Sequence, residues 1–531
     1  MKKSALLWPV ALLALAGWAA SISGCQTHPP RAASPTVIPR IWDDAARAGM
    51  ELPLVNPAAS PLYPPANYYY RIPERRIYKT YPIYHPDKEP KGYTNWLAQQ
   101  EPREILIDPA TLKTEADWIR AGKTVFEAPM FFGGPLGYTL EDIRNSAWYG
   151  PGTPGERLTK DHVMPWMVYV VRKKGVVELG SLSCANCHIR IMPDRTVIHG
   201  AQGNFPFEAA NAFDFRAGRQ GVVPAAHEAD RFLFAAPWIK PNPLAALETM
   251  SLEDMARHRD VIPPGVIARI GTSFFSPVHV PDLIGVQGRR YFDSTGLVRH
   301  RSVEDLMRYA TINALIEVLA SFDGFIPKGV FLPGGKLPAD PKESDIDRHS
   351  DAQLYALAKY VYSLKPPKNP NLPKTTEQKA RVKHGEAIFK EEGCARCHDP
   401  KQGYTNNKLI AAPGFDVPND HPAKDDIMRN ASGTPRRIGS DPTLTLTTRR
   451  GTGFYKVPSL LGVWYRGPFE HNGSVATLED WFNPARTNDT YIPTGWKGPP
   501  GTKTRAVKGH EFGLDFSEDD REAMIAFLKT L

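Results

Sequence analysis

Two five-residue stretches, Cys184–His188 (CANCH) and Cys394–His398 (CARCH), repeat one pattern: two cysteines, a two-residue spacer between them and a histidine directly after. Cys-x-x-Cys-His is the attachment site of a c-type haem, where the thiols bond to the porphyrin and the histidine ligates the iron. A zinc site needs four ligands that close on one ion, and a redox-active cysteine pair does not need the histidine. The sequence therefore predicts two covalently bound haem c groups. The predicted residues are Cys184, Cys187 and the iron ligand His188 for the first haem, and Cys394, Cys397 and the iron ligand His398 for the second.

The first residues of the chain predict export. A basic start (Met1–Lys3) precedes an apolar run over residues 5–20, which ends in Ile22–Cys25 (ISGC). This order is typical of a secretory signal, and its last four residues resemble the bacterial lipobox. We expect a lipoprotein signal peptide over 1–24 and lipid attachment at Cys25, with an uncleaved membrane anchor or ordinary secretion as the alternatives. The mature chain is then expected on the periplasmic side of the bacterial envelope, anchored by lipid to the outer membrane, or secreted.

Cysteine usage and charge narrow the function classes. Of five cysteines, one is assigned to lipid and four to the haems, so none remains for a disulfide, although an oxidising compartment would permit one. The formal net charge of +8 is spread along the chain without a basic block. We find no nucleic-acid-binding motif and expect no nucleic-acid partner. The positive charge fits an ordinary solvated surface, and it also fits an acidic redox partner or a membrane surface.

Helix signals recur before each haem motif. Thr114 precedes an acid-rich first turn and apolar residues at helical spacing, which predicts a helix that contains Gly122–Phe126 (GKTVF). A second Gly-x-x-x-Phe, Gly385–Phe389 (GEAIF), indicates an internal repeat. In the first copy, Phe126 precedes the first motif cysteine, Cys184, by 58 residues. In the second copy, Phe389 precedes Cys394 by only 5 residues. The first copy therefore carries an insertion, in which Val168–Val171 could form a short strand.

Each copy also ends in a predicted helix. Ser350–Leu364 and the segment from Ser517 to Leu531 have apolar residues at helical spacing, and acidic residues follow Ser517 in the first turn. A further amphipathic helix is predicted between Met307 and Leu319.

A helix, a haem motif, loops and a closing helix resemble the plan of a class I cytochrome c. The predicted fold class is therefore mainly α, with two class I cytochrome c-like domains in tandem and long irregular loops. We expect the first domain, with its insertion, over 111–365 and the second over 376–531. The Pro- and Tyr-rich extension over 25–110 is expected to act as a tether and then to wrap the domain surface.

The C-terminal region resembles a known superfamily. Val457–Asp480, which contains the segment VPSL and His471, is similar to the C-terminal signature of the bacterial dihaem cytochrome c peroxidase superfamily. Two haem motifs and an export signal fit the same superfamily. The Pro- and Tyr-rich N-terminal region and Gly509–Gly513 (GHEFG) are most similar to its rubber-oxygenase-like branch. The resemblance covers nearly the whole mature chain and is strongest over 376–531.

The resemblance bears on the sixth iron ligand of the second haem. Peroxidases of this superfamily place a methionine ligand at the position that matches Ala485 in this chain, so a Met-ligated haem is in doubt. The rubber-oxygenase-like branch implies a second histidine instead. The distal candidates are His510 and His471, with Met428 as a further alternative. His471 could equally be a buried histidine within its Asn-Gly turn.

The first haem has fewer sixth-ligand candidates. His199 lies 11 residues after His188, and it could ligate the iron or be a loop histidine near the haem edge. The removable distal histidine of the peroxidases matches Asn204 here. We therefore expect an open or weakly ligated first haem as the reaction centre and a second haem that relays electrons.

Three functions follow from this arrangement. The first is a peroxidase that reduces H2O2 at the first haem, with electrons relayed by the second from a periplasmic donor such as a small cytochrome or a cupredoxin. The second is an oxygenase that binds O2 at the first haem and cleaves an apolar substrate. The third is a non-enzymatic electron carrier with both irons six-coordinate. The resemblance also suggests Ca2+ between the domains, although no ligand set stands out in the sequence.

Overall fold

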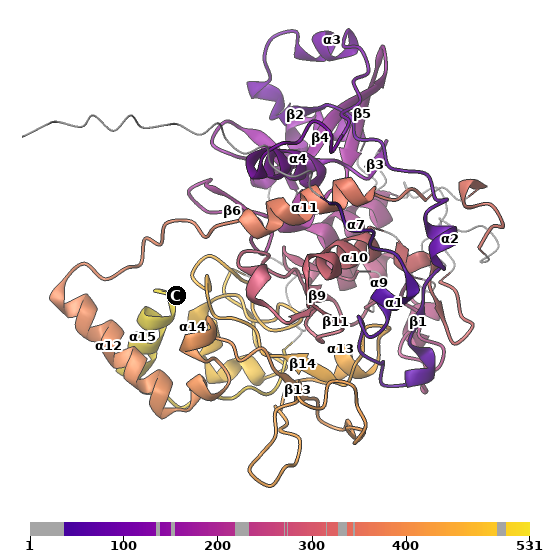
Figure 1. Ribbon diagram of the computed structural model, residues 1–531. Coiled ribbons are helices and arrows are strands. Elements are labelled where there is room, and N and C mark those ends of the chain that lie inside the picture. The colour runs from indigo at the N-terminus through magenta and orange to yellow at the C-terminus, as the bar shows by residue number, and fades with distance from the viewer. Residues whose placement is uncertain are drawn as a thin grey trace, which may run out of the picture. The chain divides into compact units, whose positions relative to one another are not determined.

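In the computed structural model, helices α4 (Glu115–Glu127) and α11 (Asp351–Ser363) cross within the region predicted as the first domain (Figure 1). Both begin at a capping box, so the two helices predicted from these N-terminal signals are confirmed. Gly122 lies at the crossing, where a Cβ would stand 1.9 Å from the Ala356 carbonyl oxygen. Only glycine allows the two backbones to approach this closely.

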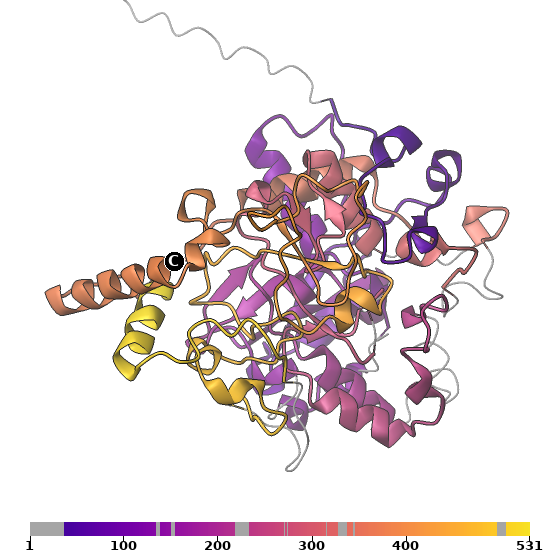
Figure 2. The ribbon, with the colours of Figure 1, turned by 90° about the horizontal axis from the view of Figure 1, so that it is seen from below.

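Helices α12 (Thr376–Glu391) and α15 (Glu518–Leu528) form the corresponding pair in the second half. They lie side by side in both ribbon views (Figures 1 and 2). Here a Cβ on Gly385 would stand 2.0 Å from the Ala523 carbonyl oxygen. The closing helix predicted from Ser517 is therefore confirmed, and the glycine of the second Gly-x-x-x-Phe has the same position as the glycine of the first.

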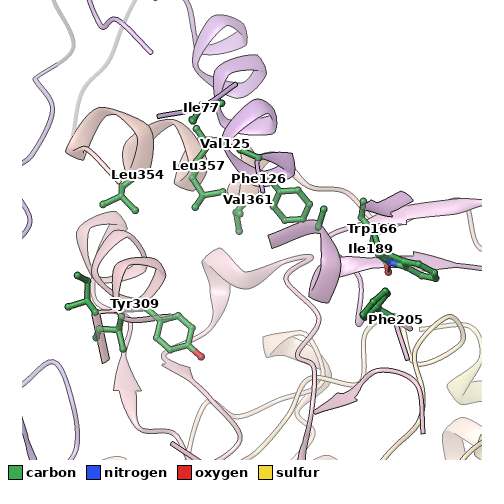
Figure 3. Packing of buried hydrophobic residues seen from close by; sticks show 14 of the residues in the cluster. Ile77, Val125, Phe126, Trp166, Ile189, Phe205, Tyr309, Leu354, Leu357 and Val361 are labelled. Atoms are coloured by element: carbon green, nitrogen blue, oxygen red, sulfur yellow. Dashed lines mark hydrogen bonds between the residues drawn. The ribbon is translucent and has the colours of Figure 1, made fainter. Parts of the chain in front are cut away.

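An aromatic pair accompanies each crossing. The ring centroids of Phe126 and Tyr360 are 5.2 Å apart at an interplanar angle of 60°. Those of Phe389 and Phe527 are 5.3 Å apart at 59°. The repeat found in the sequence thus specifies one packing arrangement twice: glycine for the backbone contact and phenylalanine for the ring contact. Figure 3 shows Phe126 beside the α11 side chains that form the core of the first pair.

Gly385→Ala is expected to destabilise the protein by about 2 kcal/mol or more, because the new methyl group would overlap a backbone carbonyl. Away from such a contact, alanine in a helix is favoured over glycine by up to about 1 kcal/mol. Gly288→Ala is the matched control, because no atom lies within 4 Å of its Cβ position. Urea unfolding of both variants measures the difference. A Gly385→Ala protein as stable as Gly288→Ala would contradict the close crossing.

Three strands of a four-stranded antiparallel sheet lie in the insertion between α4 and the first haem motif, and the fourth strand precedes α4. Its order is β2–β4–β5–β3. The strands are β2 (Thr80–Tyr84), β4 (Val163–Lys173), β5 (Val176–Ser181) and β3 (Phe131–Phe132). The strand predicted over 168–171 is confirmed as part of β4. The expected mainly α fold is corrected, because the chain is a mixed α/β protein.

The physical reason for this correction lies in β4. Its central and later residues, including Met167, Tyr169, Val170 and Val171, are buried without the alternation that marks a half-exposed strand. A tight turn with Gly175 at φ +82° joins β4 to β5. The outer strand β2 comes from the N-terminal extension, so no local pattern could indicate the pairing.

The extension from residue 37 onward is part of the core. Trp42 is fully buried and its ring stacks on Tyr69 at 4.6 Å. Arg308 donates from Nε to the Ile41 carbonyl at 2.7 Å, which fastens the segment to helix α10 (Val303–Asn313). The short helices of this segment are α1 (Asp44–Arg47), α2 (Ala66–Tyr69) and α3 (Tyr93–Ala98).

The remaining elements are short. The helix predicted over 307–319 begins earlier, at Val303, and ends at Asn313, followed by a 3-10 turn at Ile316–Leu319. The other helices are α5 (Leu140–Ile143), α6 (Cys184–His188), α7 (Phe207–Ala217), α9 (Leu252–Asp260), α13 (Thr443–Leu446) and α14 (Leu478–Trp481). Among the described residues, two-stranded antiparallel ladders pair β1 (Pro61–Leu62) with β12 (Ser321–Phe322), β6 (Ile189–Ile191) with β7 (Val197–His199), β8 (Val266–Ile267) with β9 (Val278–His279), β10 (Tyr291–Phe292) with β11 (Val298–Arg299), and β13 (Leu409–Ala411) with β14 (Phe454–Lys456).

The structure describes residues 37–133, 139–149, 154–217, 233–269, 271–272, 274–314, 316–327, 337–343, 346–495 and 506–531. The predicted signal peptide (1–24), lipid attachment site (Cys25) and first part of the tether lie outside these residues. Within them, no helix combines the length and the apolar character that crossing a membrane would require.

Candidate functional site

The first haem motif forms helix α6, and its histidine is held in one orientation. His188 Nδ1 lies 3.1 Å from the Pro281 carbonyl oxygen. Burial lowers the pKa of His188 to about 4, so the ring is neutral and donates its single N–H to Pro281. Nε2 then keeps its lone pair, as an iron ligand requires.

The second motif has the same arrangement. His398 Nδ1 lies 3.1 Å from the Pro458 carbonyl oxygen and 3.2 Å from that of Tyr404. Burial lowers the pKa of His398 as well. In both motifs, therefore, a proline carbonyl fixes the tautomer and leaves Nε2 as the available ring nitrogen.

None of the four motif cysteines is paired in a disulfide. Burial raises the pKa of Cys184 to about 11, that of Cys187 to about 12 and that of Cys394 to about 11, so these thiols stay protonated at neutral pH. Two unpaired thiols followed by an oriented neutral histidine are the donor set that a covalently attached haem needs, and the residues fit that group at both motifs.

His510 faces His398 at the second motif. Their ring centroids are 6.5 Å apart with an interplanar angle of 63°. With metal–nitrogen bonds of about 2.0 Å and imidazole rings of about 1.1 Å radius, two histidines on opposite sides of one metal have centroids about 6 Å apart. At this spacing His398 and His510 would be the two residues that hold a single iron.

The surroundings of His510 keep it neutral and in place. Burial and the neighbouring His398 lower the pKa of His510 to about 3, and its Nδ1 is buried without a hydrogen-bond partner among the described residues. The ring makes edge contacts with Trp481 and Phe512, both at 5.2 Å between centroids. Arg486 donates to the His510 carbonyl at 2.7 Å.

The other sequence candidates have different surroundings. His471 stacks on Tyr455 at 4.9 Å, and burial lowers the pKa of His471 to about 4. His471 is half-buried, and its role as a ligand or as a structural histidine of the turn stays a prediction. Met428 Sδ lies 4.0 Å from Cys397 Sγ, beside the attachment thiol. His199 lies on β7, paired with the strand that follows His188, and its Nδ1 is 3.9 Å from a Glu127 carboxylate oxygen.

Three features of the site carried no signal in the sequence. The carbonyl groups of Pro281 and Pro458 could not be assigned, because any residue can accept a hydrogen bond through its backbone. Both prolines line one cavity, so the supports of the two motif histidines meet there. His279 lines the same cavity and donates from Nδ1 to the Glu470 carbonyl at 2.8 Å. Among the described residues, no group of three or more His, Cys, Asp or Glu is placed to hold a metal ion, and the Ca2+ that the resemblance suggests stays a prediction.

Comparisons with known proteins give distant similarities. No protein-family model matches the chain. Over 234 residues it is 26% identical to the uncharacterized protein y4iM of Sinorhizobium fredii (strain NBRC 101917 / NGR234), covering 38% of this chain and 51% of that protein. The chain thus spans about half the length of this relative.

Two solved structures are also similar. Hydrazine synthase of Kuenenia stuttgartiensis is 17% identical, with 58% of this chain and 87% of that chain covered and a TM-score of 0.26. A MauG-like protein associated with microbial copper homeostasis is 16% identical, with 53% and 82% covered and a TM-score of 0.28.

Proposed function

We propose that the chain is a dihaem c-type oxidoreductase that works on the periplasmic side of the cell envelope, tethered through lipid at Cys25. One observation carries the proposal: both Cys-x-x-Cys-His histidines donate Nδ1–H to a proline carbonyl, and one of them faces a second histidine at 6.5 Å. Bound haem c supplies one-electron chemistry at its iron and, where a coordination position is open, a place for a small oxidant.

The residues around the two motifs support different roles. His398 and His510 form a pair suited to a six-coordinate haem, which favours electron transfer. At the first motif, the sequence candidate His199 contacts Glu127 rather than facing His188 as His510 faces His398. This difference supports an open first haem. We assign the reduction of H2O2 to the first site and electron entry from a small cytochrome or cupredoxin to the second.

A cavity beside the first motif favours a second candidate function, an oxygenase for an apolar substrate. The cavity has a volume of about 220 Å³ and is lined by Ala185 of the motif together with Met164, Trp166 and Val168 of β4. Glu127 also lines it, and burial raises the pKa of this carboxyl, which favours its neutral form. The apolar side chains of β4 in this lining would contact a mostly hydrocarbon substrate, beside a carboxyl whose pKa is raised.

Optical and EPR spectra of the purified protein separate these functions. We expect one low-spin and one high-spin haem, with rapid turnover of H2O2 after partial reduction. Stable O2 binding at the high-spin haem without peroxide turnover would favour the oxygenase. Two low-spin haems inert to peroxide, cyanide and O2 would contradict both enzymes and leave an electron carrier.

A further inference from the structure

A basic cavity lies between the supports of the two motif histidines. Pro281, which accepts the hydrogen bond from His188, lines it together with Pro458, which accepts from His398. A group bound in this cavity would therefore be separated from His188 by Pro281 and from His398 by Pro458.

Three cationic side chains line this cavity: Arg289, Lys456 and Arg466. Asp282 is the acidic residue in its lining, and its carboxylate already accepts from the Ile284 N–H at 3.0 Å and the Tyr465 hydroxyl at 2.9 Å. Within the described residues, none of the three cations forms an ion pair with a carboxylate.

The hydrogen bonds of these cations go to neutral acceptors. Arg289 donates to the backbone carbonyls of Asp282 and Ile284, the latter at 2.8 Å. Lys456 Nζ donates to the Tyr291 carbonyl at 3.3 Å, and Arg466 to the Ser459 carbonyl at 2.7 Å. The Nε of Arg466 is buried without a partner among the described residues. Donors therefore remain for another acceptor.

Asp282 offsets part of the charge of the three cations, and the positive charge that remains around this partly buried cavity is unfavourable without a further counter-charge. Burial, reinforced by the neighbouring Arg289, lowers the pKa of Lys456 to about 7, and burial also lowers the pKa of the Arg289 guanidinium. His279 adds no acceptor charge, because burial lowers its pKa to about 4 and the ring is neutral. A bound anion would offset this cost and use the free donors, whereas a divalent cation would be repelled.

We infer that this cavity is a binding site for a carboxylate or similar oxyanion, shared between the two haem motifs. Two sources provide this chemistry: the propionate carboxylates of the haems, and a free oxyanion such as phosphate. Binding of haem propionates rests on the proposed function, because it requires bound haem, whereas binding of a free oxyanion does not. In either case Lys456 and Arg466 provide charge, and Arg289 lines the same cavity with Pro281.

The inference is tested with Lys456→Met and Arg466→Met in the haem-loaded protein, with Lys424→Met as the control. Lys424 is exposed and belongs to the same half of the chain. Lys456→Arg keeps the charge and should behave as the wild type. Circular dichroism and thermal unfolding identify variants that fail to fold.

Two readouts distinguish the sources. If propionates fill the cavity, the propionate bending bands in resonance Raman spectra shift in both methionine variants and stay unchanged in Lys424→Met and Lys456→Arg. If the anion is free, calorimetry finds one phosphate site on the wild type, weakened at least tenfold in the methionine variants, with the Raman bands unchanged. If neither effect occurs, the cavity is not an anion site. A protein without haem, shown by its pyridine haemochrome spectrum, would refute the proposed function while the phosphate measurement still tests the cavity.

Discussion

Replacing Cys394 and Cys397 together by serine is expected to remove one haem from each chain and leave the other attached. The thiols are the attachment points, and serine cannot form the thioether bonds. The second motif directly follows α12, which packs against α15. The first motif takes no part in this helix pair, so we expect it to keep its haem when the second motif is changed. The haem absorbance per protein should therefore fall to half, and the intact mass should decrease by one haem.

The reciprocal variant, Cys184→Ser with Cys187→Ser, is the matched control for this experiment. It should lose the other haem and retain the spectrum of the His398 site. Both variants need co-expression with a cytochrome c maturation system in an exporting host, because the reaction takes place outside the cytoplasm. The loss of both haems from one double variant would show that the two sites do not form independently. A wild-type chain without covalent haem would contradict the assignment of both motifs.

An element of this fold could be predicted from the sequence where the residues that determine it lie close together along the chain. Helices α4, α11 and α15 were predictable because N-cap residues and apolar spacing lie within one short segment. Gly122 and Gly385 were recognisable as a repeat, although the carbonyl groups they approach were not. The sheet was largely missed, since its outer strand β2 comes from a distant segment and β4 lacks alternation.

The residues of the candidate site also fall into those that local sequence predicts and those that only folding brings together. The cysteines and histidines of the two motifs were predictable because all their chemistry lies within five residues. His510 was suggested by a resemblance in Gly509–Gly513, and local spacing alone gave no reason to pair it with His398. The proline carbonyls and the cluster of Arg289, Lys456 and Arg466 depend on loops brought together by folding, so no sequence pattern could indicate them.

His510→Ala is expected to convert the second haem from low spin to high spin and to leave the first haem unchanged. His510 is the side chain that faces His398 at a distance suited to a shared iron, and alanine provides no ligand. Removal of the second strong ligand should also raise the reduction potential of this haem, since bis-histidine ligation favours lower potentials than methionine–histidine ligation. EPR at low temperature and a spectroelectrochemical titration measure both effects.

His471→Ala is the control that separates ligation from packing. Both histidines are half-buried and contact aromatic rings, so both substitutions should cost about 1–3 kcal/mol of stability through lost packing. Only His510→Ala should change the spin state, because His471 stacks on Tyr455 and lies in its own turn. His510→Met should restore a low-spin signal with a higher potential, since a thioether is a weaker donor to ferric iron than imidazole. An unchanged low-spin spectrum in His510→Ala would remove His510 from the site, and loss of that spectrum in His471→Ala would assign the ligand there instead.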